Sequence, residues 1–165
     1  MPNNPSRMNK KIVAAVIALA VTAAAFCVYM VFLRCQTLIL YNSETGVVYK
    51  TFNVKEGSEF AVEFIHSVNK SPVKDGFVIR SGQIVADRTV YSAFGAGVQT
   101  EIEDGQTLEY DSRGNMIVSG FDVVFDKVKY IVGTVSDHVL YIEEESISLT
   151  ELCGKNAHVA FELKK

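Results

Sequence analysis

The feature that most constrains the fold is an alternation of apolar and polar side chains through most of the chain after the first 35 residues. In the stretch SEFAVEFIHS, Phe60, Val62, Phe64 and His66 fall on one side and their neighbours on the other. Alternation with period two is typical of a strand that is buried on one face. This row predicts a half-buried strand that ends with His66 at the rim of the core.

Eight further segments show a similar pattern, many of them rich in Val, Ile, Tyr and Phe. They are Thr37–Tyr41, Gly46–Phe52, Gly76–Arg80, Gln83–Tyr91, Met116–Val118, Phe121–Val132, His138–Glu143 and His158–Leu163. Turn-forming residues separate them, including Asp75-Gly76, residues 111–115 and Ser119-Gly120. Because turns recur about every eight to twelve residues and no long amphipathic helical pattern intervenes, we expect an all-β fold, either an antiparallel β-sandwich or a partly closed β-barrel.

The second constraint is an apolar stretch near the N-terminus. Ile12–Leu33 contains 22 residues without a charge. At about 1.5 Å per residue, a helix of this length measures roughly 33 Å, which exceeds a hydrocarbon core of about 30 Å. The stretch therefore predicts one transmembrane helix.

The charges beside this stretch predict its orientation. Arg7, Lys10 and Lys11 precede it, and Arg34 alone borders its other end. By the positive-inside rule, the N-terminus lies in the cytoplasm. We expect a single-pass protein of the cytoplasmic (inner) membrane with three parts: a cytoplasmic tail (1–11), a transmembrane signal-anchor helix (12–33) and an extracytoplasmic β domain (35–165).

Two other fates of the N-terminus remain alternatives. A cleavable signal peptide could use Ile12–Val21 as its apolar region and residues 23–25 as its small-residue cleavage site. Cleavage there would leave Phe26–Leu33 as an apolar tail on the mature protein, so we favour a retained anchor. A lipoprotein is disfavoured because large residues stand directly before Cys27 and Cys35.

Composition and charge exclude several classes of function. The chain is 48% hydrophobic with a net charge of −3, which argues against a disordered protein. After Arg34, 12 basic and 19 acidic residues give a net charge of −7, so the β domain has no electrostatic footprint for nucleic acid. Motifs of serine hydrolases, zinc proteases and phosphate-binding loops are absent from the sequence. We therefore expect no enzyme activity, no metal and no cofactor.

The cysteines allow two interpretations. Cys27 lies within the apolar stretch, whereas Cys35 and Cys153 would both lie outside the membrane. A disulfide between Cys35 and Cys153 would stabilise the domain by roughly 3 to 5 kcal/mol in the chain-entropy model, if it formed without strain. The alternative is two separate thiols.

Two segments are more specialised than plain strands require. The first, His66–Phe77, is polar and contains Pro72, although it joins two apolar strands. The second, Tyr91–Val98, has an aromatic pair followed by glycines that allow positive φ or close backbone approach. Together they supply the candidate residues for binding a ligand or partner: His66, Ser67, Lys70, Ser71, Pro72, Tyr91, Phe94, Gly95 and Gly97.

These two segments resemble the signature of the family called domain of unknown function 1850. Its members carry a His-Ser-Val-x-Lys-(Ser/Thr)-Pro-Val run, here at 66–73, and a later Ser-x-Phe-Gly-Ala-Gly run, here at 92–97. The resemblance spans roughly 38–163, and Asn69 and Asp75 depart from the Glu that many relatives carry there. It implies a small extracytoplasmic or membrane-anchored domain, associated with tripartite ATP-independent periplasmic (TRAP) transporters that use a TAXI-type solute receptor. The family has no assigned reaction.

The leading functional hypothesis is an accessory or solute-handling component of such a transport system, in contact with its permease or receptor. Lys70 would then contact an anion, with Ser67 and Ser71 as hydroxyl donors. In a purely structural interpretation, Pro72 and the glycines only shape turns and Lys70 is solvated. The alternative function is a non-catalytic envelope scaffold or interaction module with an exposed edge strand or apolar patch. A hydrolase that uses Ser67 with His66 is disfavoured, because adjacent strand residues point to opposite faces.

Overall fold

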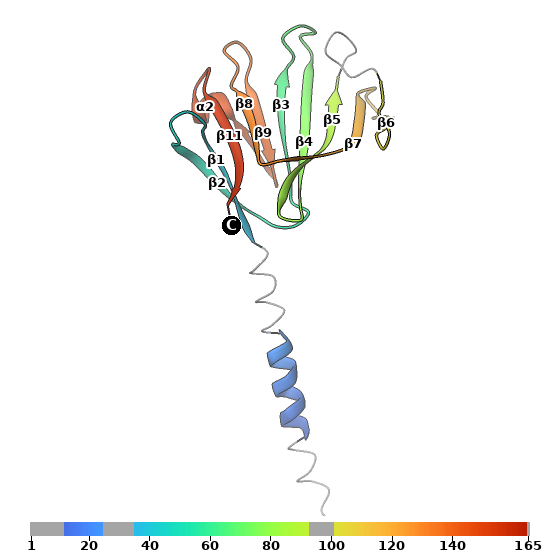
Figure 1. The fold of residues 1–165 in the computed structure, drawn as a ribbon, viewed down its shortest axis with the longest axis vertical. Coiled ribbons are helices and arrows are strands. Elements are labelled where there is room, and N and C mark those ends of the chain that lie inside the picture. Colours follow the sequence, from blue (N-terminus) through green and yellow to red (C-terminus); the bar gives the residue numbers. More distant parts are fainter. Residues whose placement is uncertain (1–11, 25–34, 93–100, 165) are drawn as a thin grey trace, which may run out of the picture. The chain divides into compact units, whose positions relative to one another are not determined.

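The computed structural model describes residues 12–24, 35–92 and 101–164, in a chain that divides into two compact units, Met1–Cys35 and Gln36–Lys165 (Figure 1). In the first unit, residues 12–24 are helical. Among the described residues, no helix combines the length and the apolar character that a membrane crossing requires. The rest of the expected anchor, 25–33, lies outside the described residues. The transmembrane helix therefore remains a prediction.

The second unit, called the β unit below, consists of two antiparallel sheets. The smaller sheet has the order β2-β1-β11-β8, formed by β1 (Gln36–Asn42), β2 (Val48–Val54), β8 (Lys127–Ile131) and β11 (His158–Lys164). The larger has the order β10-β9-β3-β4-β5-β7-β6, formed by β3 (Glu59–Ile65), β4 (Pro72–Arg80), β5 (Gln83–Tyr91), β6 (Thr107–Tyr110), β7 (Met116–Phe125), β9 (His138–Ile142) and β10 (Glu145–Ser148). A short helix, α2 (Leu149–Cys153), connects β10 to β11.

One hydrophobic core lies between the two sheets. Phe60 of the larger sheet stacks on Phe77 with ring centroids 5.0 Å apart, and its ring meets Phe161 of the smaller sheet at 5.3 Å. Leu38, Val62 and Phe161 are fully buried. The expected all-β fold of antiparallel strands is confirmed. The partly closed barrel is wrong, because the described strands form two separate hydrogen-bonded sheets that meet through side chains.

Two predicted turns prove to lie inside strands. Asp75-Gly76 belongs to β4, where the register shifts after Gly76. A Cβ on Gly76 would lie 3.1 Å from the Arg88 Cγ, so glycine suits this close approach. Ser119-Gly120 lies within β7, where Gly120 has a φ of +82°. Both glycines permit local irregularity in a continuing strand, which sequence reasoning mistook for chain reversal.

The turn predicted at residues 111–115 is confirmed. It joins β6 to β7, with the Asp111 N–H donating to the Asn115 carbonyl oxygen at 3.0 Å. The Asp111 carboxylate accepts from the Asn115 side chain, and this hydrogen bond is the main reason that the pKa of Asp111 lies below its usual range.

Of the two interpretations of the cysteines, the structure supports the one without a disulfide between Cys35 and Cys153. The register explains why. Thr37 pairs with Lys164 at one end of the β1–β11 ladder, and Asn42 pairs with Val159 at the other. Cys35 adjoins the first end, whereas Cys153 ends α2, five residues before β11 begins at the second end. At about 3.4 Å per residue the ladder is roughly 17 Å long, and a disulfide requires Cα atoms within about 7 Å.

Candidate functional site

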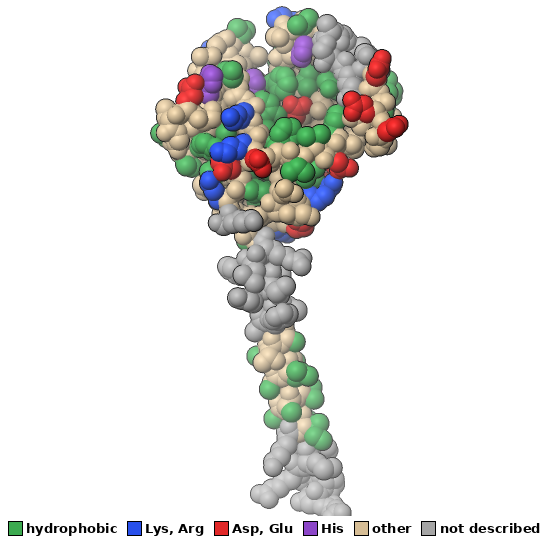
Figure 2. All heavy atoms as spheres, in the orientation of Figure 1, with side chains coloured by type: hydrophobic (Ala, Val, Ile, Leu, Met, Phe, Trp, Pro, Cys, Tyr) green, Lys and Arg blue, Asp and Glu red, His purple; other side chains and the backbone are tan. Residues whose placement is uncertain are grey.

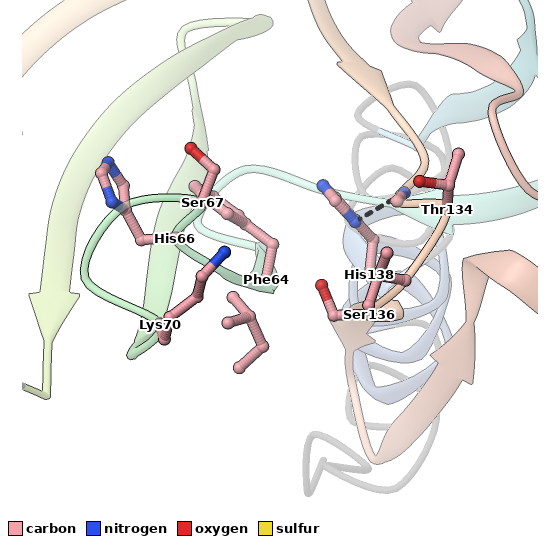
Figure 3. A pocket seen from close by; sticks show the side chains of 10 residues that line it. Phe64, His66, Ser67, Lys70, Thr134, Ser136 and His138 are labelled. Carbon is pink, nitrogen blue, oxygen red and sulfur yellow. Dashed lines mark hydrogen bonds between the residues drawn. The ribbon is translucent and has the colours of Figure 1, made fainter.

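A pocket of about 580 Å³ opens between two loops at one end of the β unit. One loop, residues 66–71, joins β3 to β4, and the other, residues 132–137, crosses from β8 to β9. Figure 2 shows the β unit hollowed, with hydrophobic side chains visible inside the hollow, and Figure 3 shows the pocket from close by. The lining residues are Phe64, Ile65, His66, Ser67, Lys70, Gly133, Thr134, Val135, Ser136 and His138.

The 66–71 loop is closed by hydrogen bonds of His66. Its backbone N–H donates to the Ser71 carbonyl oxygen at 2.9 Å, and its carbonyl oxygen accepts from the Lys70 N–H at 3.0 Å. Its Nδ1 accepts from the backbone N–H groups of Val68 and Asn69, both at 3.3 Å. A side chain that caps its own turn in this way fixes the loop backbone. The imidazole of His66 therefore stabilises the conformation of the loop.

Lys70 is the charged side chain of this loop, and it adopts the left-handed conformation with a φ of +54°. Lys70 takes part in none of the ion pairs found among the described residues. In Figure 3 its ammonium group points into the space between the two loops. The turn thus presents one positive charge to the pocket.

The 132–137 loop is anchored at both ends. The Val132 N–H donates to the Ala157 carbonyl oxygen at 2.9 Å, and the Gly133 N–H donates to the His138 Nδ1 at 3.1 Å. A Cβ added to Gly133 would collide with the Ser136 carbonyl oxygen, so the loop requires glycine at this position. These contacts place Ser136 and His138 on the side of the pocket opposite Lys70 (Figure 3).

His138 forms part of an aromatic floor. Its ring stacks on Phe64 with centroids 5.3 Å apart and planes within 13°, and it meets Tyr130 edge-on at 6.0 Å. Burial lowers the pKa of His138 below its usual value, although the negative charge of Asp137 opposes this effect. Since Nδ1 accepts the Gly133 N–H, the proton of the neutral ring lies on Nε2. In Figure 3 this second nitrogen faces the pocket.

A polar contact across the sandwich supports this floor. The Tyr130 hydroxyl on β8 donates to the Asp75 Oδ2 on β4 at 2.9 Å, and the Thr89 hydroxyl on β5 donates to Oδ1 at 2.9 Å. Burial raises the pKa of Asp75, and the two hydrogen bonds partly offset this rise. Burial and the nearby Asp75 charge raise the pKa of Tyr130, so its hydroxyl remains a donor at neutral pH. The contact fixes the Tyr130 ring beside Phe64 and His138.

The structure brings some of the predicted site residues together and separates others. His66, Ser67 and Lys70 line the pocket. Ser71 is buried behind it, and Pro72 is the exposed first residue of β4. Tyr91 ends β5 and packs on Met116 and Val118 instead. The remaining candidates, Phe94, Gly95 and Gly97, lie outside the described residues.

The two sequence motifs nevertheless adjoin. Val73 pairs with Tyr91 across the β4–β5 ladder. Next to this pair, the Ser92 hydroxyl donates to the Pro72 carbonyl oxygen at 2.7 Å. The end of the first motif is therefore in direct contact with the start of the second.

Sequence reasoning missed half of the pocket. His138 was not among the predicted site residues, and the 132–137 loop has no recognisable motif. The signal that could have found them is the pairing of Phe64 with His138 between β3 and β9. That pairing joins residues far apart in the chain, so no local pattern reveals it. Asp75 and Tyr130 were missed for the same reason.

The pocket carries groups that can bind a ligand. Lys70, several hydroxyl groups and an imidazole N–H face an aromatic floor, and no Asp or Glu is among the described residues that line it. Within the part of the chain that the structure describes, no group of three or more His, Cys, Asp and Glu side chains could hold a metal ion. Among the described residues, Ser67 forms no hydrogen bond with His66 or His138.

The fold and the pocket together define an all-β module whose candidate binding site lies on loops between two sheets. The chain belongs to the family described as Domain of unknown function (DUF1850), whose sequence profile matches residues 60–149. Comparison with curated proteins and with solved structures finds no match to the chain. The matched region contains both loops of the pocket.

Proposed function

We propose that this chain is a non-catalytic, solute-binding accessory component of a TRAP/TAXI-type secondary transport system. One observation carries the proposal: among the described residues that line the pocket, Lys70 is the only Lys or Arg, it lies opposite Ser136 and His138, and none is an Asp or Glu. A site with this charge favours a small anion. The link to TRAP/TAXI transport rests on the family resemblance of the two motifs.

The apolar stretch completes the proposal. Residues 12–33 would anchor the chain in the cytoplasmic membrane, with residues 1–11 inside and the β unit outside. The β unit would then meet solutes, a receptor or a permease on the outer side. Within the β unit, Gln36 and Lys164 lie at the end of the sandwich opposite the pocket loops.

The first experiment tests anion binding. Thermal unfolding of the full-length chain in a mild non-ionic detergent is measured with a panel of small organic acids. A binding anion stabilises the folded chain in proportion to its occupancy, and Lys70→Met should remove this shift. Lys55→Met is the matched control, since Lys55 is an exposed lysine in the turn before β3 and does not line the pocket. If no organic acid shifts the melting temperature, the chain is not a binder of small acids.

The second experiment tests the transport assignment. A chain tagged at the C-terminus is purified from membranes of cells that express the neighbouring genes, and co-purifying proteins are identified by mass spectrometry. The proposal expects a permease or a solute receptor. Recovery of neither protein, under conditions in which both are shown to be present, would remove the transport role while leaving solute binding intact.

An exposed edge supports a second candidate, the envelope scaffold or interaction module. All four residues of β6 are exposed, and β6 is the last strand of its sheet in the described structure. Leu108 and Tyr110 are 40% and 56% exposed on this strand. A strand edge with apolar side chains can pair with another chain. Leu108→Lys should abolish partner capture if the scaffold is correct, whereas Lys70→Met should abolish it if the pocket carries the function.

A further inference from the structure

The charge of the pocket indicates how many negative charges its ligand carries. Lys70 provides one positive charge. The Nδ1 atoms of His66 and His138 both accept backbone N–H groups, so neither ring offers an Nδ1–H group to a ligand. A dianion would leave one negative charge without a partner in a partly desolvated site, which is unfavourable. The pocket is therefore matched to a single negative charge.

The donors of the pocket suit a carboxylate. The Lys70 ammonium faces the Ser136 hydroxyl and the Nε2–H of His138 across the space between the loops (Figure 3). A carboxylate has two oxygens that together accept several hydrogen bonds, and it can engage donors on both sides. No acceptor with a negative charge lines the pocket to repel it. Asp137, the nearest acid in sequence, is engaged by the Thr150 N–H at 3.0 Å and is not among the lining residues.

The rest of the lining is apolar. Phe64 forms the floor with the stacked His138 ring, and Ile65 and Val135 also line the pocket. Val135 is 97% exposed and Ile65 is 37% exposed. Apolar side chains exposed around a polar centre favour a ligand that covers them with an apolar body. A volume of about 580 Å³ falls within the range of roughly 300–1,000 Å³ that is usual for small-molecule sites.

We propose that the pocket binds a small monocarboxylic acid with an apolar body, its carboxylate between Lys70 and His138 and its body over Phe64 and Val135. This proposal rests on the proposed function and gives it a ligand class. It distinguishes the solute from dicarboxylates and from phosphate esters, which share the negative charge but lack the apolar surface.

Isothermal titration of the full-length chain in one detergent tests the ligand class with three probes of similar length. They are 4-methylpentanoate, its neutral amide 4-methylpentanamide, and the dicarboxylate glutarate. We expect 4-methylpentanoate to bind about tenfold or more tightly than either of the others, which is the usual effect of losing one charge-assisted hydrogen bond or burying one unpaired charge. Lys70→Met should remove the preference for the acid over the amide.

A second variant tests the apolar contact. Val135→Ser should weaken binding of 4-methylpentanoate about three- to tenfold, and its exposed position makes a folding defect avoidable. Val47→Ser is the matched control, since Val47 is also exposed, at 58%, and lies on another turn. Circular dichroism verifies that each variant is folded.

The outcomes separate this proposal from the function on which it rests. Glutarate or inorganic phosphate binding at least as tightly as 4-methylpentanoate would overturn the ligand class and leave an anion-binding domain. An unchanged affinity in Val135→Ser would overturn the placement of the apolar body. Absence of binding by every acid and by phosphate would overturn both proposals.

Discussion

The hydrogen bond between Tyr130 and Asp75 provides the sharpest test of the structure. It joins the smaller sheet to the larger one, and it holds the aromatic ring that supports Phe64 and His138. Tyr130→Phe removes the hydroxyl and retains the ring. The substitution therefore isolates the polar contact from the packing.

The expected cost follows from the environment of Asp75. At neutral pH the carboxylate would keep only the Thr89 hydroxyl as a side-chain partner, at 2.9 Å. Loss of a hydrogen bond to a buried charged group costs about 1.5–3 kcal/mol. We expect the free energy of unfolding to fall by that amount at pH 7. Tyr141→Phe is the matched control, because the Tyr141 hydroxyl also lies near a carboxylate, that of Glu63. Tyr141 is more exposed to solvent, so we expect a loss below about 1 kcal/mol.

The pH dependence separates the polar contact from a general packing defect. Burial raises the pKa of Asp75 in the folded state above its ordinary value of 3.8. The folded state therefore binds the proton more tightly than the unfolded state, and the contribution of Asp75 to stability is full below pH 3.8 and is lost as pH rises through the folded pKa. Tyr130→Phe should raise this pKa further, so its cost should be smaller at pH 4 than at pH 7.

Urea unfolding of the full-length chain, followed by far-UV circular dichroism at both pH values, measures these effects, since the chain has no Trp to report by fluorescence. An equal cost of Tyr130→Phe at pH 4 and pH 7 would refute the role of the charged carboxylate. If Tyr130→Phe lowers the free energy of unfolding at pH 7 no more than Tyr141→Phe does, the burial of the Tyr130–Asp75 contact is refuted.

Three further predictions concern the loops and the thiols. Gly133→Ala should reduce ligand binding at least tenfold, because its Cβ collides with the Ser136 carbonyl oxygen. Normal binding by Gly133→Ala would contradict the loop geometry. The pKa of His138 is lowered in the folded state, so the stability that His138 contributes is present above the pKa of the unfolded state, near 6.5, and is lost as pH falls through the folded pKa. His138→Gln should therefore flatten the decline in melting temperature between pH 7 and pH 5. An unchanged decline would refute this assignment. Burial raises the pKa of the Cys153 thiol to about 11. Iodoacetamide at pH 8 should therefore modify Cys153 slowly in the folded chain and readily in urea without reductant, as measured by mass spectrometry. Modification in urea only after reduction would indicate that Cys153 forms a disulfide.

The sequence predicted strands well where local pattern and tertiary context agree. Gln83–Tyr91 is found with the bounds expected. Phe60 and Val62 face the core, and Phe64 lines the pocket. Prediction failed at the start of β4, where Pro72 and Asp75-Gly76 are typical of turns. In the structure Pro72 takes the first position of the strand, where a missing N–H is tolerated. Gly76 then allows the Arg88 side chain to approach.

The candidate site could be predicted only in part, for a related reason. The 66–71 loop has a local signature, since a histidine can cap its own turn and a proline can begin the next strand. The facing loop depends on the pairing of β3 with β9 and on the crossing between sheets from β8 to β9. Such contacts depend on burial of the whole core, so no short sequence pattern predicts them.

The core lies in the sandwich and the pocket lies on the loops, so substitutions can change ligand binding and stability separately. The core residues Leu38, Val62 and Phe161 lie between the sheets and do not line the pocket. Lys70 and Val135 are exposed on loops that the sandwich positions. Substitutions at Lys70 and Val135 should therefore change ligand affinity with little change in the free energy of unfolding. Tyr130 is the exception, because it stabilises the sandwich and supports the floor of the pocket at the same time, so Tyr130→Phe should change both quantities together.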